Sequence, residues 1–392
     1  MKKISIFCMS GWGELGNKLT ATNLMNKIKS IDSSHQVNLY CANEFFEMFE
    51  DVGRDIKKAA LTSISPDDLY DQYSFIMKTY DRIYLDILGD KNNFLKMMNK
   101  FINIIQSTKP DIIFCTKGVI ARVCVDICSI VGLSPFILNY VSNHQHFQFK
   151  IHHTSGVNLH LVRTKEGYDY FMNNFKDQEE KIRFLGYIVA HNLNHLTEHS
   201  TISRVLKPNL ITAIIVSNRG GVSYYNLIES LLVLADKINL IYITINDEVI
   251  SNKVQNLVDK YNIKNWQVIN KLSQDKYYSL LANANKISNQ ILITKASPNS
   301  IYEAIYLNIP MILHRSGLPM EDWSCSLVEK NFLGIVHKNM DELKKNIINN
   351  LSNHEMLNFA KNKGLVYKNA LPSQEEISSE LGDIISLLDS GF

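Results

Sequence analysis

The sequence predicts an α/β fold made of two domains, each a parallel sheet with crossover helices. Three observations favour it. Short β-branched runs alternate with longer helical patterns, and the alternation restarts after residue 209. The chain has 392 residues, enough for two domains of about 100–200 residues each. Its 45% apolar and 20% charged residues are typical of a folded globular protein and too apolar for a disordered one.

The first half contains five predicted strands, with helices after the first, third and fifth. The strands are Ile4–Cys8, Val37–Cys41, Asp111–Cys115, Pro135–Tyr140 and Leu159–Val162, and the helices are Lys18–Ser30, Ile120–Val131 and Lys165–Asn173. Strands that alternate with helices form parallel sheets, and right-handed crossovers bring the carboxyl ends of all strands to one edge. We expect any ligand at that edge.

The second half repeats this pattern. Its predicted strands are Leu210–Ser217, Leu240–Ile245, Trp266–Ile269, Gln290–Ile293 and Pro310–Leu313; its first helix is Tyr224–Asp236, and the amphipathic stretch Ser373–Leu388 ends the chain. The polar stretch over residues 189–209, which precedes this second half, has no steady apolar period. The expected division is therefore a Rossmann-like domain over 1–188, a linker over 189–209, a second Rossmann-like domain over 210–370 and a C-terminal helix over 371–392 that returns to the first domain.

Charge and composition exclude several classes of protein. The 41 basic and 39 acidic residues give a net charge of +2, which offers no electrostatic footprint for nucleic acid. No apolar run is long enough to span a bilayer, and the six cysteines form no CxxC pair, so we expect a cytoplasmic protein with reduced cysteines. The aromatic and Met-rich residues 69–105 are expected either to pack on the first sheet or to contact an apolar acceptor or the inner face of a membrane.

The segment most informative about chemistry follows the apolar strand that ends at Thr294. Ser297, Asn299 and Ser300 stand between this strand and a predicted helix. The first amides of a helix have no partner within it and lie at the positive end of the macrodipole, so they bind phosphate. Glu303 lies one turn into the helix, where its carboxylate can accept both hydroxyls of a ribose. The alternative is an ordinary strand, serine cap and helix with no ligand.

The run from Thr294 to Ala304, followed by Asn308-Ile-Pro310 and Leu318-Pro-Met-Glu321, resembles the donor-site signature of GT-B glycosyltransferases. The group it resembles contains monogalactosyldiacylglycerol synthase, processive diacylglycerol glucosyltransferases and the peptidoglycan N-acetylglucosaminyltransferase. This resemblance implies two Rossmann-like domains facing each other across a cleft. It also implies an inverting, metal-independent transfer of a sugar from a nucleotide diphosphate sugar, most often a UDP-sugar, to an acceptor hydroxyl on a lipid or a small molecule. The first domain would bind the acceptor and the second the donor.

The resemblance also implies a role for individual residues. The donor diphosphate would be bound by Ser297, Asn299, Ser300, Ile301, Arg219 and Gly220; the ribose by Glu303; the base by Ile269 and Leu272; the donor sugar by Met320, Glu321 and Asp322; and the acceptor loop would contain Gly13, Gly16 and Asn17. This chain departs from the family at Ser297 and Asn299, where glycine is usual. It also departs at Met320 in place of glutamine, and at Asn17 in place of histidine.

Three residues are candidates for the catalytic base. His144 and His146 lie in the loop after the strand at Pro135, and a neutral imidazole can take a proton from an attacking hydroxyl near neutral pH. Glu14 is the only carboxylate in the first glycine-rich turn. The alternatives are a loop histidine with its own partners and a carboxylate that complements a helix dipole. No metal site is expected, although His191, His195 and His199 recur every four residues.

Two other functions fit the same predicted fold. A nucleotide-sugar 2-epimerase shares the phosphate and ribose contacts but needs further acidic and basic groups in the cleft. A catalytically silent nucleotide-sugar-binding protein would explain the departures at Asn17 and Met320. Fold alone does not distinguish these possibilities.

Overall fold

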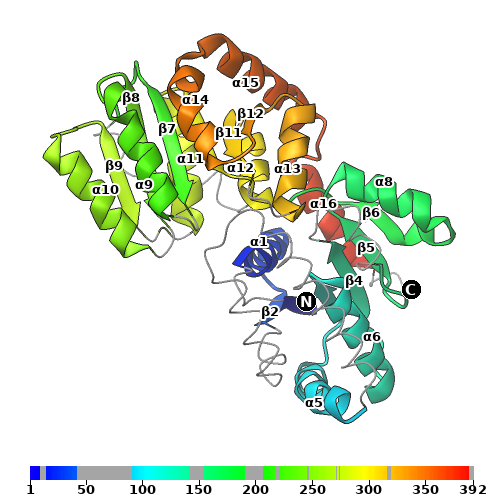
Figure 1. The fold of residues 1–392 in the computed structure, drawn as a ribbon. Coiled ribbons are helices and arrows are strands. Elements are labelled where there is room, and N and C mark those ends of the chain that lie inside the picture. Colours follow the sequence, from blue (N-terminus) through cyan, green and yellow to red (C-terminus); the bar gives the residue numbers. More distant parts are fainter. Residues whose placement is uncertain are drawn as a thin grey trace. The chain divides into compact units, whose positions relative to one another are not determined.

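A computed structural model describes residues 1–8, 15–41, 91–141, 153–189, 206–217, 221–244, 247–270, 272, 274–315 and 319–387. The chain forms two compact units. One unit combines Met1–His191 with Pro372–Phe392, and the other is Asn192–Leu371. Figure 1 shows a parallel sheet with helices in each of them.

The first unit is built on a six-stranded parallel sheet in the order β2-β1-β3-β4-β5-β6. The strands are β1 (Lys3–Cys8), β2 (Gln36–Cys41), β3 (Ile112–Cys115), β4 (Phe136–Val141), β5 (Leu159–Val162) and β6 (Ile182–Phe184). The helices are α1 (Leu15–Ile31), α5 (Lys91–Thr108), α6 (Gly118–Val131), α8 (Lys165–Asn174) and α16 (Gln374–Ser386), with a 3-10 helix over Lys176–Lys181.

Alternate residues of β1 enter two different cores, one on each face of this sheet. Phe7 packs with α5 and α6, and its ring lies 5.4 Å from that of Phe101. Ile4 and Ile6 pack with α1 and α16 on the other face. Because side chains alternate across a strand, this two-sided burial produces the nearly continuous apolar runs from which the strands were predicted. The buried Phe101 supports the first of the two alternatives given for residues 69–105, which is packing on the first sheet. Residues 69–90 lie outside the described residues.

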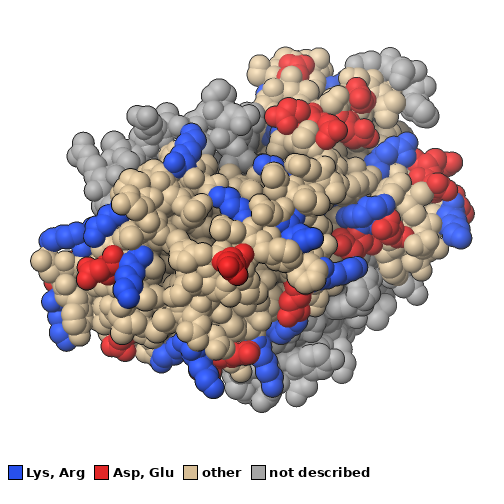
Figure 2. Space-filling view, turned by 90° about the horizontal axis from the view of Figure 1, so that it is seen from above, with Lys and Arg blue, Asp and Glu red and all other residues tan. Residues whose placement is uncertain are grey.

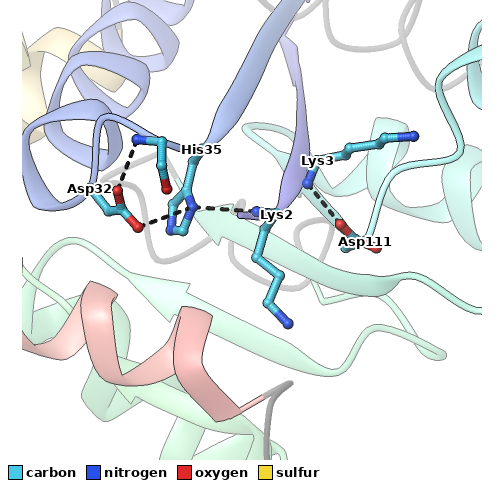
Figure 3. A network of polar contacts seen from close by, with 6 residues as sticks. Lys2, Lys3, Asp32, His35 and Asp111 are labelled. Atoms are coloured by element: carbon cyan, nitrogen blue, oxygen red, sulfur yellow. Dashed lines mark hydrogen bonds and ion pairs between the residues drawn. The ribbon is translucent and has the colours of Figure 1, made fainter.

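The amino end of β1 is fixed by polar contacts that involve its own backbone (Figure 3). The Lys3 amide donates to the Asp111 carboxylate at 2.7 Å, and the Lys2 amide donates to His35 Nδ1 at 3.4 Å. His35 in turn lies 3.6 Å from the Asp32 carboxylate. These contacts join β1 to the segments before β2 and β3, so they have a structural role at the edge opposite to the one expected to bind ligands.

The C-terminal helix α16 belongs to the first unit, as the sequence predicted. Its apolar face is buried against α1 and contributes Ile377, Leu381, Ile384 and Ile385 to the core. Gln374, at its first turn, donates to the Tyr187 carbonyl at 2.9 Å and accepts from the Val189 amide at 3.3 Å. Its own carbonyl accepts from Lys27 Nζ at 3.0 Å, so one residue joins α16 to α1 and to the segment after β6.

Truncation of Leu381 to alanine is expected to destabilise the first unit by about 2–5 kcal/mol, because the side chain is fully buried and leaves a cavity. Urea unfolding, monitored through the hydrogen exchange of amides in the first unit, measures the effect. Leu387→Ala, at an exposed residue directly after this helix, is the matched control and should cost much less. Equal, small losses for both variants would contradict the packing of α16 described above.

The second unit contains another six-stranded parallel sheet, in the order β12-β11-β10-β7-β8-β9. Its strands are β7 (Ile211–Ser217), β8 (Ile238–Thr244), β9 (Trp266–Asn270), β10 (Gln290–Lys295), β11 (Met311–His314) and β12 (Gly334–His337). Its helices are α9 (Gly221–Ser230), α10 (Glu248–Lys260), α11 (Gln274–Ile287), α12 (Pro298–Tyr306), α13 (Pro319–Lys330), α14 (Met340–Ser352) and α15 (His354–Asn369), with a 3-10 helix over Leu231–Leu234.

Two parallel six-stranded sheets with crossover helices confirm the predicted fold class of two Rossmann-like domains. The structure adds two strands that the sequence did not predict, β6 and β12. It also divides the helix predicted over Tyr224–Asp236, since α9 ends at Ser230 and a 3-10 turn follows. Within the described ranges, no helix combines the length and apolarity required to cross a membrane.

Charged side chains of both signs are dispersed over the described part of the face seen in Figure 2. In the face seen in Figure 2, lysine and arginine side chains alternate with aspartate and glutamate over the described part and do not form one broad patch of a single sign. This distribution agrees with the net charge of +2. An anion bound by this protein must therefore be held by a few local groups rather than by the field of the whole molecule.

Candidate functional site

The second sheet has a switch point between β7 and β10. From β7 the chain proceeds through α9 to β8 and β9 on one side, and then returns to β10, on the other side of β7, before β11 and β12. Ligands of open α/β sheets bind at the carboxyl edge where the strand order reverses in this way. The two strands are joined there by Thr294, whose hydroxyl donates to the Val216 carbonyl at 3.2 Å.

The amino end of α12 lies at this switch point. Ser297 is extended, with φ −84° and ψ 126°, and precedes Pro298, the first helical residue. The Ser297 side chain makes no capping hydrogen bond. The Ile301 amide donates to the Ser297 carbonyl at 3.0 Å, so the backbone amides before Ile301 form the opening turn of the helix. An opening turn at the carboxyl edge of a sheet is suited to a phosphate group.

Glu303 lies one turn further along α12, on the same face as Ser300. Its side chain is only 3% exposed, and burial raises the pKa of the carboxyl group to about 7. A contact with the Tyr278 hydroxyl acts in the opposite direction and lowers this pKa. The carboxyl group therefore changes its charge near neutral pH, which is unusual for a glutamate.

Two tyrosines of α11 interact with Glu303. Burial raises the pKa of Tyr277 well above its usual value; the charge of Glu303 raises it further, and the adjacent Ser300 hydroxyl lowers it. The rings of Tyr277 and Tyr278 are 6.0 Å apart. Sequence reasoning missed both residues. The available signal was a pair of tyrosines in the helix before the apolar strand, but their contact with α12 depends on how α11 packs across the sheet.

Other strands of this sheet also carry polar residues at their carboxyl ends. The Ser217 and Tyr242 hydroxyls are 2.8 Å apart, and Thr244 donates to the Asn270 side-chain oxygen at 3.0 Å. His314, at the end of β11, lies 3.1 Å from the Tyr224 hydroxyl. These groups make the whole carboxyl edge polar, and a polar residue at the end of each apolar run is the sequence signal that would have identified them.

The remaining residues proposed from the sequence have different positions. Ile269 lies in β9 and Leu272 just after it, both half-buried, at the edge of the sheet two strands from β7. Met320, Glu321 and Asp322 lie in the first turn of α13. Gly16 and Asn17 belong to the first turn of α1, which begins at Leu15, three residues before the predicted helix start. Six candidates lie outside the described residues: Gly13, Glu14, His144, His146, Arg219 and Gly220.

The histidines that the sequence analysis singled out lie outside the part of the chain that the structure describes. His191, His195 and His199 are among them. His153 stacks on Phe175 with ring centroids 3.7 Å apart and hydrogen-bonds to the Gln178 side chain at 3.2 Å, so it has a packing role. In the part of the chain that the structure describes, no group of three or more histidine, cysteine, aspartate or glutamate side chains is arranged to hold a metal ion.

Comparisons with known proteins identify the fold. No protein-family model matches the chain, and no curated protein matches its sequence. Solved structures match over nearly the full length. UDP-GlcNAc 2-epimerase from Neisseria meningitidis bound to UDP-GlcNAc has a TM-score of 0.58 at 10% identity, covering 99% of this chain and 100% of that chain.

Two glycosyltransferase structures match to the same degree. Arabidopsis thaliana UGT89C1 complexed with UDP-L-rhamnose has a TM-score of 0.57 at 7% identity, covering 97% of this chain and 98% of that chain. The spinosyn rhamnosyltransferase SpnG complexed with thymidine diphosphate has a TM-score of 0.58 at 10% identity, covering 99% and 100%. The chain therefore has the GT-B fold that 2-epimerases and glycosyltransferases of nucleotide sugars share.

Proposed function

We propose that this protein is an inverting, metal-independent glycosyltransferase that takes its sugar from a nucleotide diphosphate sugar, most often a UDP-sugar. The single observation that carries the proposal is the arrangement at the switch point of the second sheet. There the opening turn of α12 and the Glu303 carboxyl group lie on one helix face, one turn apart. A diphosphate and a ribose are separated in the same way along a nucleotide.

In the proposed reaction, an acceptor hydroxyl oxygen attacks the anomeric carbon of the donor sugar. The bond between this carbon and the diphosphate oxygen breaks, the nucleoside diphosphate leaves with the electron pair, and a base takes the hydroxyl proton. The amides and dipole at the start of α12, with Ser297, Asn299 and Ser300, would stabilise the charge on the leaving diphosphate. Arg219 and Gly220 would complete the phosphate contacts, and Met320, Glu321 and Asp322 would contact the sugar.

The acceptor side of the proposal rests on the sequence resemblance alone. We propose a membrane lipid or a small molecule as the acceptor, bound by the first domain with Gly13, Gly16 and Asn17. We also propose a cytoplasmic location, and a lipid acceptor would then bring the protein to the inner face of the membrane. As part of the same proposal, we assign the protein to the subgroup of GT-B enzymes that glycosylate lipids.

A 2-epimerase acting on a nucleotide sugar is the second candidate function, because a 2-epimerase is among the solved structures that match this fold. Calorimetric titration with UDP, GDP, dTDP and their common sugar conjugates tests both candidates. Absence of binding to all of them would overturn both. Slow hydrolysis of the bound donor favours the transferase, an epimerised sugar detected by NMR favours the epimerase, and binding without turnover favours a silent binding protein.

The catalytic base is tested by single substitution of His144 and of His146 to alanine. If His144 is the base, turnover falls by about a hundredfold or more, within the usual contribution of general base catalysis, while donor affinity is unchanged. Glu14→Gln examines the remaining candidate in the same assay. Unchanged turnover in both histidine variants would contradict a histidine base.

A further inference from the structure

Phe332 has a backbone conformation that phenylalanine rarely adopts. It lies in the turn that ends α13, with a left-handed φ of +56°, and its side chain is 57% exposed. A bulky side chain is strained in this conformation, because its Cβ approaches the neighbouring backbone. The ring is more exposed than buried, so packing does little to offset this strain. Phe332 is therefore poorly explained by the stability of the folded unit alone.

The same turn ends two other helices of the second unit, where the left-handed residue is asparagine. Asn262 follows α10 and Asn308 follows α12, with φ of +50° and +54°. In all three turns the amide of the left-handed residue donates to the carbonyl three residues earlier, and the next amide donates to the carbonyl five residues before it. Asparagine tolerates this conformation better than phenylalanine does. The turn itself therefore does not require a phenylalanine at position 332.

Phe332 belongs to an exposed apolar surface that continues along α15. Its ring meets the ring of Phe359 edge-on, with the centroids 6.0 Å apart, and these are the two exposed phenylalanines among the side chains that the structure describes. Met356 and Val366 are also exposed and lie on the same face of α15 as Phe359. Another side of the helix packs on α12 and β12. We call Phe332, Met356, Phe359 and Val366 the α15 surface.

Positive charge accompanies the α15 surface. Lys363 lies one turn after Phe359, and its Nζ is 5.4 Å from the centre of that ring. Lys330, exposed, stands two residues before the turn residue of α13. The last turn of α13 and the whole of α15 contain four lysines and two glutamates, and one of the glutamates is paired with Arg315. Lys361 hydrogen-bonds to the segment before β10 instead, which leaves three lysines beside the apolar groups.

A bilayer that contains anionic lipids fits this combination better than a second copy of the chain does. In a two-fold interface the same surface of both copies meets itself, so the lysines of one copy would face the lysines of the other. At a bilayer, phenylalanine and methionine side chains enter the boundary of the acyl chains. Lysines beside them extend to the phosphate groups of the lipids, which supply the opposite charge.

We propose that the α15 surface binds the protein to membranes that contain anionic lipids. The surface belongs to the second unit, whereas residues 69–105, the stretch for which the sequence suggested membrane contact, belong to the first. The inference concerns membrane attachment and does not depend on the proposed transfer reaction. A protein of this structure that acted on a soluble acceptor would bind the membrane in the same way.

The test measures the partition of the full chain into sedimenting vesicles of equimolar phosphatidylcholine and phosphatidylglycerol. Phe332→Asn should lower the partition coefficient about tenfold, because one aromatic ring no longer leaves water. The melting temperature should not fall, since asparagine suits the turn. Phe359→Ser, which leaves that turn unchanged, should lower partition to a similar degree. Lys363→Gln should lower it about fivefold, and vesicles of phosphatidylcholine alone should bind the unmodified chain more weakly.

Tyr261→Asn is the matched control. Tyr261 is a 53% exposed aromatic residue of the same unit, and the Nζ of Lys260 lies 5.2 Å from the centre of its ring. It therefore has the exposure and the neighbouring cation of Phe359 at a position outside the α15 surface. Partition of this variant should equal that of the unmodified chain.

Four results overturn the inference. Failure of the unmodified chain to bind the anionic vesicles would do so, and would leave the proposed function standing if UDP still binds. Equal partition of the unmodified chain, Phe332→Asn and Phe359→Ser would place membrane contact elsewhere. A lower melting temperature of Phe332→Asn with unchanged partition would make its ring a packing element. A dimer in analytical ultracentrifugation that Phe332→Asn abolishes, without vesicle binding, would make the surface an interface between copies.

Discussion

Replacement of Glu303 by glutamine is expected to weaken UDP binding by about a hundredfold or more. A carboxylate that accepts two ribose hydroxyls makes two charge-assisted hydrogen bonds, each of which contributes roughly 1.5–3 kcal/mol. Glutamine has nearly the same shape but only one acceptor oxygen and no charge, so at least one of these bonds is lost and the other is weakened. Calorimetric titration of both proteins at pH 8, where the wild-type carboxyl group is mostly ionised, measures the difference.

The control for this experiment is Glu355→Gln, at an exposed glutamate in the first turn of α15. It removes the same charge from the same domain at a position away from the switch point, so UDP affinity should not change. Equal affinities of the wild-type protein and Glu303→Gln would show that Glu303 does not contact the ribose. The buried carboxyl group would then have to be explained by packing alone.

The two units are expected to lose stability at opposite ends of the pH range. In the first unit, His160 is buried, and burial lowers its pKa from 6.5 to about 3. The unfolded chain takes up a proton below about pH 6.5 that the folded unit does not accept, so stability is lost as the pH falls from about 6.5 towards 3. By pH 4.5 the loss amounts to about 3 kcal/mol.

In the second unit the sign is reversed. Burial raises the pKa of Glu303 from 4.5 to about 7, so the folded unit retains a proton that the unfolded chain releases. The contribution of this group is therefore fully present below about pH 4.5 and is lost as the pH rises through about 7. By pH 8 the loss is again about 3 kcal/mol.

Hydrogen exchange analysed by mass spectrometry measures the opening of each unit separately between pH 4.5 and 8, after correction for the intrinsic exchange rate. His160→Gln should flatten the acid loss of the first unit, and Glu303→Gln should flatten the alkaline loss of the second. His354→Gln, at an exposed histidine of α15, is the control and should leave both profiles unchanged. Parallel pH profiles for the two units would contradict both assignments.

The fold was accessible from the sequence because each central strand is a continuous apolar run. β5 lies at the bounds predicted for it, and the other nine predicted strands are found within two residues of theirs. The two missed strands, β6 and β12, have three and four residues and lie at the sheet edges. β12 also begins with Gly334, a poor strand former. Such short strands are stabilised by pairing with a neighbouring strand, as Gly334 pairs with Met311. The hydrophobic pattern of a few residues does not show which strand they will pair with.

The candidate site was predictable only in part. Ser297 and Glu303 could be located because a cap and a helix after a buried strand define positions along one chain segment. The tyrosines that interact with Glu303 could not, because α11 and α12 are separated by β10 and the contact is tertiary. The raised pKa of Glu303 has the same origin, since it arises from enclosure by residues that sequence spacing does not bring together.

The attachment of α16 by Gln374 has a consequence for how the protein can be divided. The second unit is one continuous segment inserted into the first, which resumes at Pro372. The chain leaves and re-enters the first unit at neighbouring points, since the Val189 amide is 3.3 Å from the Gln374 side-chain oxygen. A few flexible residues that connect position 190 to position 372 are long enough to close the gap. We therefore expect that the first unit can be produced without the second, provided that the C-terminal helix is retained.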